Sequence, residues 1–346
     1  MREIVLLARY NLYFILFFPL VVFPQRFPDH KIDSLLTRGI AEIVKQEYNS
    51  AYETFSEIDS LNPNLPFGKT YLAAVLIAKS TDYAEDYNTN KINELLDSAK
   101  VKSEILLDQN ESDLWNNYFI ALTLGYRAYF KILTGNYLDA FVDGYKSVQY
   151  FERCMQIKPE FSEAYLALGT YKYWKSAKAS SLNWLPFFND NRKEGINLLE
   201  HAIRNSSYNK YLALNSLIWI YINEKDYVKA KEIAEMALND FPGSRFFMWG
   251  LARAYEDIDK NKAIKTYKEI RNSLASEKHL TNINNVELLH KMAMLYHRQN
   301  NLTESLKLLT AIDDIKLDED ELERLEERLI RIESLRKEIL NKLSDR

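Results

Sequence analysis

The chain has 346 residues, of which 47% are hydrophobic and 13% aromatic, enough for a sizeable core in two ordinary domains or one elongated array. Only 9 Gly and 8 Pro interrupt it, which disfavours a β protein with many turns and favours long helices. The formal net charge of −4 offers no basic surface for nucleic acid, and the single Cys154 excludes an internal disulfide and a cysteine-based zinc cluster.

Residues 1–25 differ from the rest of the chain. Arg2 and Arg9 precede an apolar run over residues 12–23, which is interrupted by Pro19. This run is short for a membrane span and has the order of a secretory signal peptide, so we expect export to the periplasm or another compartment of the cell envelope. Because the segment ends in VVFPQ and lacks a small-residue cleavage site, a retained membrane anchor is the alternative.

A helical hairpin pattern begins at residue 26 and recurs with a period of about 34 residues. Its first unit spans 32–65 and is marked by Gly39, Tyr48, Ala51, Phe55 and Pro63. Residues 66–107 form a degenerate hairpin with the polar linker TDYAEDYNTN. In the next unit, LTGNYLDAF (133–141) supplies a Gly-Asn-Tyr turn and Ala140, between helices that we expect to be longer than usual.

The following unit is interrupted. In a regular unit Gly195 would follow Gly169 by 12 positions, but it follows by 26, which places a 14-residue insertion near 176–191. The insertion carries Trp184, Phe187 and Phe188, and leaving such side chains in water forgoes roughly 1.5–3 kcal/mol each. We therefore expect these aromatic residues either to cover the chain's own surface as a lid or to bind a partner or ligand.

Residues 211–244 form the clearest unit. The apolar face of the first helix holds Leu214, Leu217 and Tyr221, an Asp-Tyr turn follows at 226–227, and the second helix carries Ala230, Ala234 and Ala237. These residues resemble the tetratricopeptide repeat (TPR), in which small side chains let the two helices of a hairpin approach closely. The same pattern recurs in 245–277 at Met248, Leu251, Ala252, Tyr255, Ala263 and Tyr267, and in 286–319 at Leu289, Met292, Ala293, Tyr296 and Leu309.

The TPR resemblance implies an all-α, right-handed α-solenoid of about seven hairpins over residues 26–319. Within it, the stretch from YLALGTYKYW to NDNRKEGINLLEHA also resembles a divergent TPR family that includes mitochondrial outer-membrane proteins of inclusion-body clearance and their bacterial relatives. Asp190, Arg192 and Gly195 match the helix start of that family, while Asn189 stands where the family has glycine. This second resemblance implies a scaffold role.

Residues 320–346 predict a charged amphipathic helix. Its apolar stripe is broken at Arg336 and consists of Leu322, Leu325, Leu329, Ile332, Ile339 and Leu343. Pairs of opposite charge four residues apart lie at Asp320–Arg324, Glu327–Arg331, Glu333–Lys337 and Glu338–Lys342. We expect this helix to cap the last hairpin, and a coiled-coil contact with a partner is the alternative.

The first helices of TPR hairpins line a concave groove, which binds extended peptides or helices in that family. Aromatic residues and arginine are typical of binding hot spots. Together with the insertion, the candidate partner-binding residues are Trp174, Trp184, Phe187, Phe188, Trp219, Trp249, Arg253, His290 and Arg298. Trp219 and Trp249 could instead fill space between neighbouring helices.

No nucleophile, phosphate-binding or dinucleotide motif occurs, and we predict neither a catalytic residue nor a cofactor. Glu287, His290 and His297 share a helical face but lack a zinc-binding motif, so no metal is predicted. The sequence favours a non-enzymatic scaffold of the cell envelope that binds a protein or peptide. The alternatives are a glycan- or peptidoglycan-handling solenoid, which would need paired acids near Trp219 and Trp249, and a membrane-tethered adaptor.

Overall fold

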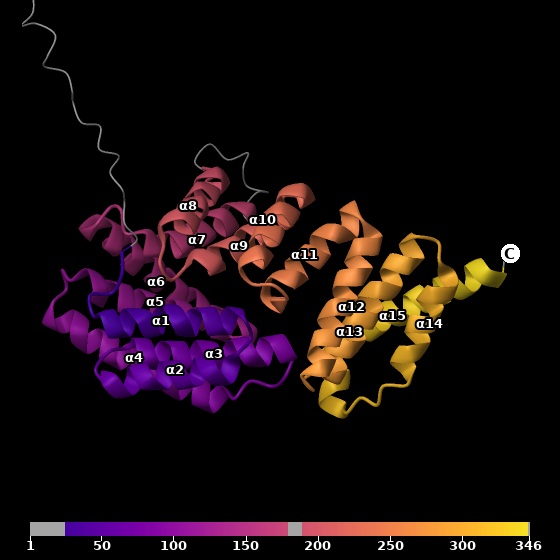
Figure 1. The fold of residues 1–346 in the computed structure, drawn as a ribbon, viewed down its shortest axis with the longest axis horizontal. Coiled ribbons are helices and arrows are strands. Elements are labelled where there is room, and N and C mark those ends of the chain that lie inside the picture. Colours follow the sequence, from indigo (N-terminus) through magenta and orange to yellow (C-terminus); the bar gives the residue numbers. More distant parts are fainter. Residues whose placement is uncertain (1–24, 179–188, 345–346) are drawn as a thin grey trace, which may run out of the picture.

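The helical hairpin is the building unit of the chain. In the computed structural model, which describes residues 25–178 and 189–344, all the regular structure in those ranges is helical (Figure 1). In chain order the helices are α1 (His30–Val44), α2 (Tyr48–Leu61), α3 (Phe67–Tyr83), α4 (Thr89–Gln109), α5 (Leu114–Leu133), α6 (Tyr137–Ile157), η1 (Ser162–Ala164), α7 (Tyr165–Lys178), α8 (Arg192–Asn205), α9 (Lys210–Asn223), α10 (Tyr227–Asp240), α11 (Arg245–Ile258), α12 (Lys260–Ser276), α13 (Asn282–Arg298), α14 (Leu302–Asp313) and α15 (Glu319–Ser344). From α1 to α14, successive helices pack as hairpins, each against the next. The all-α solenoid of TPR-like hairpins is thus confirmed.

The turns inside the hairpins show why these helices end where they do. A residue with positive φ stops the first helix, and the Asn or Asp that follows accepts a backbone N–H and caps the second helix. This design occurs at Gly135–Asn136, Lys225–Asp226 and Asn300–Asn301. Turns of this kind are determined by a few adjacent residues, which is why the hairpin pattern could be predicted from the sequence.

Small residues set the distance between the helices of a hairpin. A Cβ atom on Gly169 would lie 2.7 Å from the carbonyl oxygen of Gly195, and one on Gly195 would lie 2.6 Å from the carbonyl oxygen of Gly169. In the hairpin of α9 and α10, the side chains of Ala230, Ala234 and Ala237 are fully buried. Gly169 and Gly195 therefore face each other across α7 and α8, as the repeat predicts.

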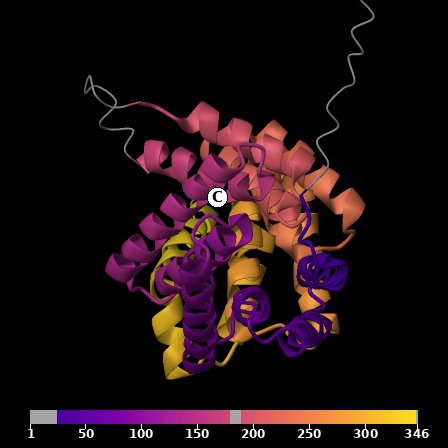
Figure 2. The ribbon, with the colours of Figure 1, turned by 90° about the vertical axis from the view of Figure 1, so that its left-hand side faces the viewer.

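The solenoid closes on itself, which the repeat pattern did not predict. Repeats of a solenoid ordinarily contact only their neighbours. Here the start of α1 contacts the start of α9, where the Tyr208 hydroxyl donates to Asp33 and accepts from the backbone N–H of Phe27. The end of α1 contacts the start of α11, where the Ser244 hydroxyl donates to the carbonyl of Val44 at 2.6 Å. Figure 2 shows these indigo N-terminal helices beside the orange C-terminal half.

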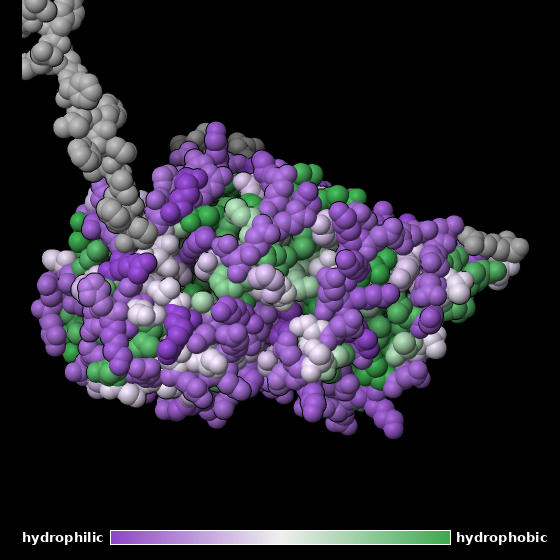
Figure 3. Space-filling view, viewed as in Figure 1, coloured by the Kyte–Doolittle hydropathy of each residue, from purple (hydrophilic) through white to green (hydrophobic). Residues whose placement is uncertain are grey.

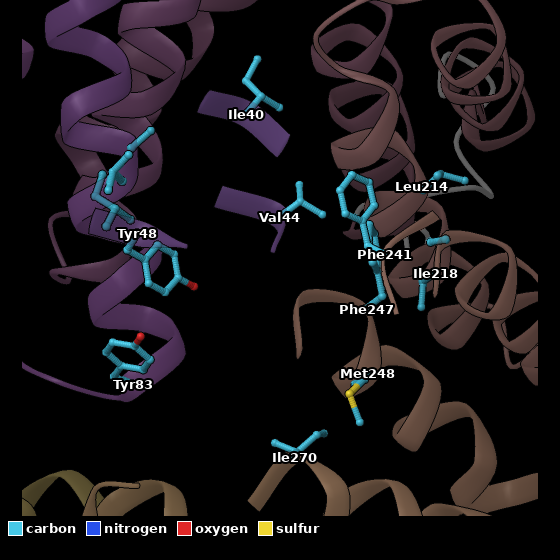
Figure 4. Packing of buried hydrophobic residues seen from close by; sticks show 14 of the residues in the cluster. Ile40, Val44, Tyr48, Tyr83, Leu214, Ile218, Phe241, Phe247, Met248 and Ile270 are labelled. Atoms are coloured by element: carbon cyan, nitrogen blue, oxygen red, sulfur yellow. The ribbon is translucent and has the colours of Figure 1, made fainter. Parts of the chain in front are cut away.

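Apolar packing accompanies these hydrogen bonds. Ile40 and Val44 on α1 point toward Phe241 and Phe247 across the closing contact, and all four belong to one buried cluster (Figure 4). At the end of α3, the ring of Tyr83 stacks on His279 with 4.0 Å between ring centroids. The first two hairpins and the last three therefore share one hydrophobic core.

Helix α15 occupies the position that the first helix of another hairpin would take. It packs against both α13 and α14 and buries Leu325, Ile332 and Ile339, so the predicted capping role is confirmed. Leu322 and Leu343, which were predicted to join the buried stripe, are exposed instead.

The charge pairing of α15 also differs from the prediction in one place. Glu327–Arg331, Glu333–Lys337 and Glu338–Lys342 are paired, at 3.5, 3.9 and 2.6 Å. Arg324, predicted to pair with Asp320, reaches instead to Asp86 in the loop after α3, at 2.9 Å. This contact forms because the start of α15 lies beside the loop after α3, where Arg324 also donates to the carbonyl of Ala84 at 3.0 Å.

Candidate partner-binding surface

Three neighbouring first helices, α7, α9 and α11, present one continuous face. They lie side by side, because α9 contacts both α7 and α11. Residues four apart in a helix share a face, so each helix contributes one pair of side chains to the shared surface. We call this surface the aromatic face, and it consists of Thr170, Trp174, Asn215, Trp219, Trp249 and Arg253.

The three tryptophans of the aromatic face differ in exposure. Trp219, on the middle helix, is 39% exposed. Trp174 and Trp249 are half-buried: Trp174 meets the ring of Tyr173 edge-on, and Trp249 lies 6.0 Å from the ring of Tyr267. Trp174 and Trp249 thus fill space between helices in part, whereas Trp219 offers a large rigid ring to the outside. Figure 3 shows hydrophobic surface gathered between hydrophilic borders over the α7 to α11 part of the molecule.

Two polar atoms of the aromatic face are buried without hydrogen-bond partners among the described residues. These are the hydroxyl oxygen of Thr170 and the side-chain carbonyl oxygen of Asn215. Leaving such an atom unsatisfied costs about 1–3 kcal/mol. Both lie one helical turn before a tryptophan, Trp174 and Trp219 respectively.

Arg253 is held in place by its neighbours. Its guanidinium pairs with Asp257 at 2.7 Å and with Glu256 at 3.5 Å, and it lies over the ring of Tyr227. Glu256 in turn accepts a hydrogen bond from Tyr267 at 2.5 Å. The charge of Arg253 is therefore largely compensated, and its planar group forms a fixed edge of the aromatic face.

His290 was predicted to line the groove, and the structure places it in the interior instead. It is 2% exposed, and burial together with Arg328 and Arg331 of α15 lowers its pKa to about 4, which keeps the ring neutral near pH 7. Helix α15 covers this position, so His290 is not available to a partner. Arg298, at the end of α13, is exposed as expected.

The other residues of the possible metal set are also engaged by α15. Glu287 lies 3.1 Å from Arg328, and His297 lies 3.2 Å from Glu338. Within the described ranges, no group of three or more His, Cys, Asp or Glu side chains could bind a metal ion.

Trp184, Phe187 and Phe188 lie outside the described residues, so their place relative to the aromatic face stays a prediction.

Just after the insertion, Arg192 forms a forked contact with Asp190 at 2.6–3.0 Å and reaches Glu224 at 3.2 Å. These groups border a shallow depression of ≈ 490 Å³ between α8, α9 and α10. The Asp190–Arg192 contact explains two of the three residues that match the divergent TPR family, and the close approach at Gly195 explains the third.

Sequence reasoning missed one surface altogether. Seven large apolar side chains are exposed at the turn between α5 and α6, and they are Tyr129, Ile132, Tyr137, Leu138, Phe141, Val142 and Tyr145. Their signal was present in the sequence, because YLDAFVDGY has Phe141, Val142 and Tyr145 where the matching positions of α10 are the charged Lys231, Glu232 and Glu235.

No helix in the described ranges combines the length and apolar character required to cross a bilayer. The apolar run at 12–23, on which the expected signal peptide or anchor rests, lies outside those ranges.

Comparison with known proteins returns structural similarity alone. No family model matches the sequence, and no curated protein matches it. Among solved structures, TTC0263, a TPR protein of Thermus thermophilus, is 13% identical, with a TM-score of 0.41, covering 64% of this chain and 98% of its own. A TPR protein of Cytophaga hutchinsonii is 16% identical, with a TM-score of 0.40 and coverage of 83% and 98%. Yeast Tom70 is 15% identical, with a TM-score of 0.40 and coverage of 94% and 69%.

Proposed function

We propose that this protein is a non-enzymatic scaffold that binds a peptide or protein segment on its aromatic face. The observation that carries the proposal is the exposed ring of Trp219, which stands between Trp174 and Trp249 on three adjacent helices. Large aromatic rings anchor binding because they bury much apolar area and lose few rotamers when they are immobilised.

The groups that the face exposes suit an extended segment. The oxygen atoms of Thr170 and Asn215 are buried, so the exposed ring of Trp219 and the guanidinium of Arg253 are the groups that a partner can reach. Arg253 is held rigidly, so a hydrogen bond to it costs little additional side-chain entropy. An exposed aromatic ring beside a fixed arginine favours a peptide chain with bulky side chains.

A peptide library displayed on phage, selected against the full chain, tests this proposal. Trp219→Ala should weaken the selected peptides by about 2 kcal/mol or more, because the ring is the exposed anchor. Met236→Ala, which truncates an exposed side chain on the second helix of the same hairpin, is the matched control and should leave binding unchanged. Peptides that bind both variants equally well would place the binding site elsewhere.

The glycan-handling alternative gains no support from the acids near the aromatic face. Glycoside hydrolysis requires two carboxyl groups placed on either side of a bond. Glu256 and Asp257, which follow Trp249 on α11, both pair with Arg253. Their role in this structure is to hold the arginine, so binding is the better assignment.

We also propose that the scaffold works in the cell envelope, after export directed by residues 1–25. Sequencing the N-terminus of the protein isolated from its native host tests this directly. A new N-terminus near residue 25 indicates cleavage and release, whereas an intact Met1 in the membrane fraction indicates a tether. An intact N-terminus in the cytosol would contradict export.

A further inference from the structure

The turn between α5 and α6 carries an apolar surface that the proposed function does not use. We call it the apolar tip, and it consists of Tyr129, Ile132, Tyr137, Leu138, Phe141, Val142 and Tyr145. Their exposed fractions run from 46% for Tyr129 to 85% for Leu138. On α6 the residues 137, 138, 141, 142 and 145 are spaced to share one helical face.

The fold itself does not need this face to be apolar. When the turns at Asn136 and Asp226 are superposed by sequence, α6 and α10 have matching positions. Leu138, Phe141, Val142 and Tyr145 of α6 correspond to Val228, Lys231, Glu232 and Glu235 of α10. The equivalent face of α10 is thus mostly charged, although the two hairpins have the same design.

The core-facing side of α6 is already complete. Ala140, Val148 and Phe151 are buried, and the Ser147 hydroxyl donates to the carbonyl of Ala121 at 2.7 Å. Asp143, at the edge of the apolar tip, is neutralised by Arg127 at 3.1 Å and Lys131 at 2.7 Å. The core of the hairpin therefore does not need the apolar side chains on the outward face of α6, and this face carries no uncompensated charge at its centre.

The size of the apolar tip fits a stable interface. Taking about 200 Å² for each large side chain and its exposed fraction, the seven residues present about 800 Å². The largest apolar patch on a typical monomer is about 300–600 Å². A dimer of standard size buries about 800 Å² on each partner, so the tip supplies one complete half of such an interface.

We propose that the apolar tip binds the apolar tip of a second copy of this chain, with the two α6 helices packed antiparallel about a two-fold axis. A two-fold interface requires a surface that is complementary to itself. Asp139 and Lys146 are both exposed and lie about two turns apart along the same flank of α6. Antiparallel pairing about a point between Val142 and Asp143 places Asp139 of each copy opposite Lys146 of the other.

Sedimentation equilibrium of the full chain tests the proposal. The chain has a mass of 40.7 kDa, and the dimer should have twice this mass at micromolar concentration. Phe141→Glu should raise the dimer dissociation constant about a hundredfold, because it buries an unpaired charge. Val228→Glu, at the position of α10 that matches Leu138, is the control and should leave the dimer intact.

A charge exchange separates this arrangement from unspecific sticking. Asp139→Lys and Lys146→Asp should each weaken the dimer, because each places like charges opposite one another, and the double variant should restore it. A monomeric wild-type chain would overturn the proposal, as would a double variant that stays weak while circular dichroism shows native helix content. A monomer is also the result expected if another segment of this chain, or a different protein, covers the tip.

Discussion

Replacing Arg245 with methionine tests the closure of the solenoid at its most buried ion pair. Arg245 begins α11 and is 1% exposed. Its guanidinium forms two parallel contacts with Asp82 at the end of α3, at 2.7 and 3.1 Å, and also donates to Ser273 and Glu277 at 2.6 Å. One side chain thus joins the first half of the chain to the second.

The expected cost follows from what the substitution leaves behind. The side chain of Asp82 is 9% exposed, and without Arg245 its carboxylate has lost its main counter-charge in a buried place. Breaking a buried pair in this way costs about 3–5 kcal/mol of unfolding free energy. When Asp82→Asn is added, the remaining group is neutral, and the double variant should lose about 1–3 kcal/mol.

Urea unfolding of the wild type, both single variants and the double variant gives the coupling energy. We expect about 2 kcal/mol or more, since the two residues are in direct contact. Arg331→Met, which removes an arginine from an exposed pair on α15, is the matched control and should change stability little. A loss below about 1 kcal/mol for Arg245→Met, or independent effects of the two single variants, would refute the view that this pair holds the solenoid closed.

Two further predictions concern local features. Burial raises the pKa of Glu163 to about 7, although hydrogen bonds from Ser206 and from the backbone after it act to lower this pKa. Between pH 4.5 and about 7, the folded protein therefore keeps a proton on Glu163 that the unfolded chain has lost. The stabilisation is complete below the ordinary value of 4.5 and is lost as the pH rises through about 7. The urea midpoint of the wild type should therefore fall between pH 5 and pH 8, and the midpoint of Glu163→Gln should fall less. A fall of equal size in both proteins would contradict this assignment. Gly195→Ala should lower stability by about 1–3 kcal/mol, because the added Cβ meets the backbone of α7. Lys193→Ala, at an exposed position of the same helix, is the control and should leave stability unchanged. A thermal melt in which both variants match the wild type would show that the two helices separate without cost.

The hairpins could be predicted because their determinants are local. The turn at Asp226 and the alanines of α10 lie within a few residues of one another, and each has a direct structural effect: a cap, or a close helix contact. The register of Gly169 and Gly195 survived an insertion because helix contact depends on spacing within each helix. The periodicity of apolar residues and the capping residues were therefore sufficient to predict the fold class.

The closure of the solenoid could not be predicted, because it depends on pairs that are far apart in sequence. Arg245 is separated from Asp82 by 163 residues and looks like an ordinary first-turn residue in its own repeat. His290 was misplaced for the same reason: its helix predicts a groove position, and only the path of α15 shows that it is covered. The aromatic face could be predicted in part, because the repeat places Trp219 on a first helix but does not give the exposed fraction of its side chain.

The closure also fixes when the protein can finish folding. During synthesis Asp82 leaves the ribosome 163 residues ahead of Arg245, an interval of roughly ten to thirty seconds. Through that time Val44 and Tyr83 lack the residues that later cover them. An ordinary solenoid can consolidate repeat by repeat as it emerges, but here the first hairpins must wait for the sixth and seventh, so the newborn chain has a long period in which its N-terminal half needs protection from aggregation.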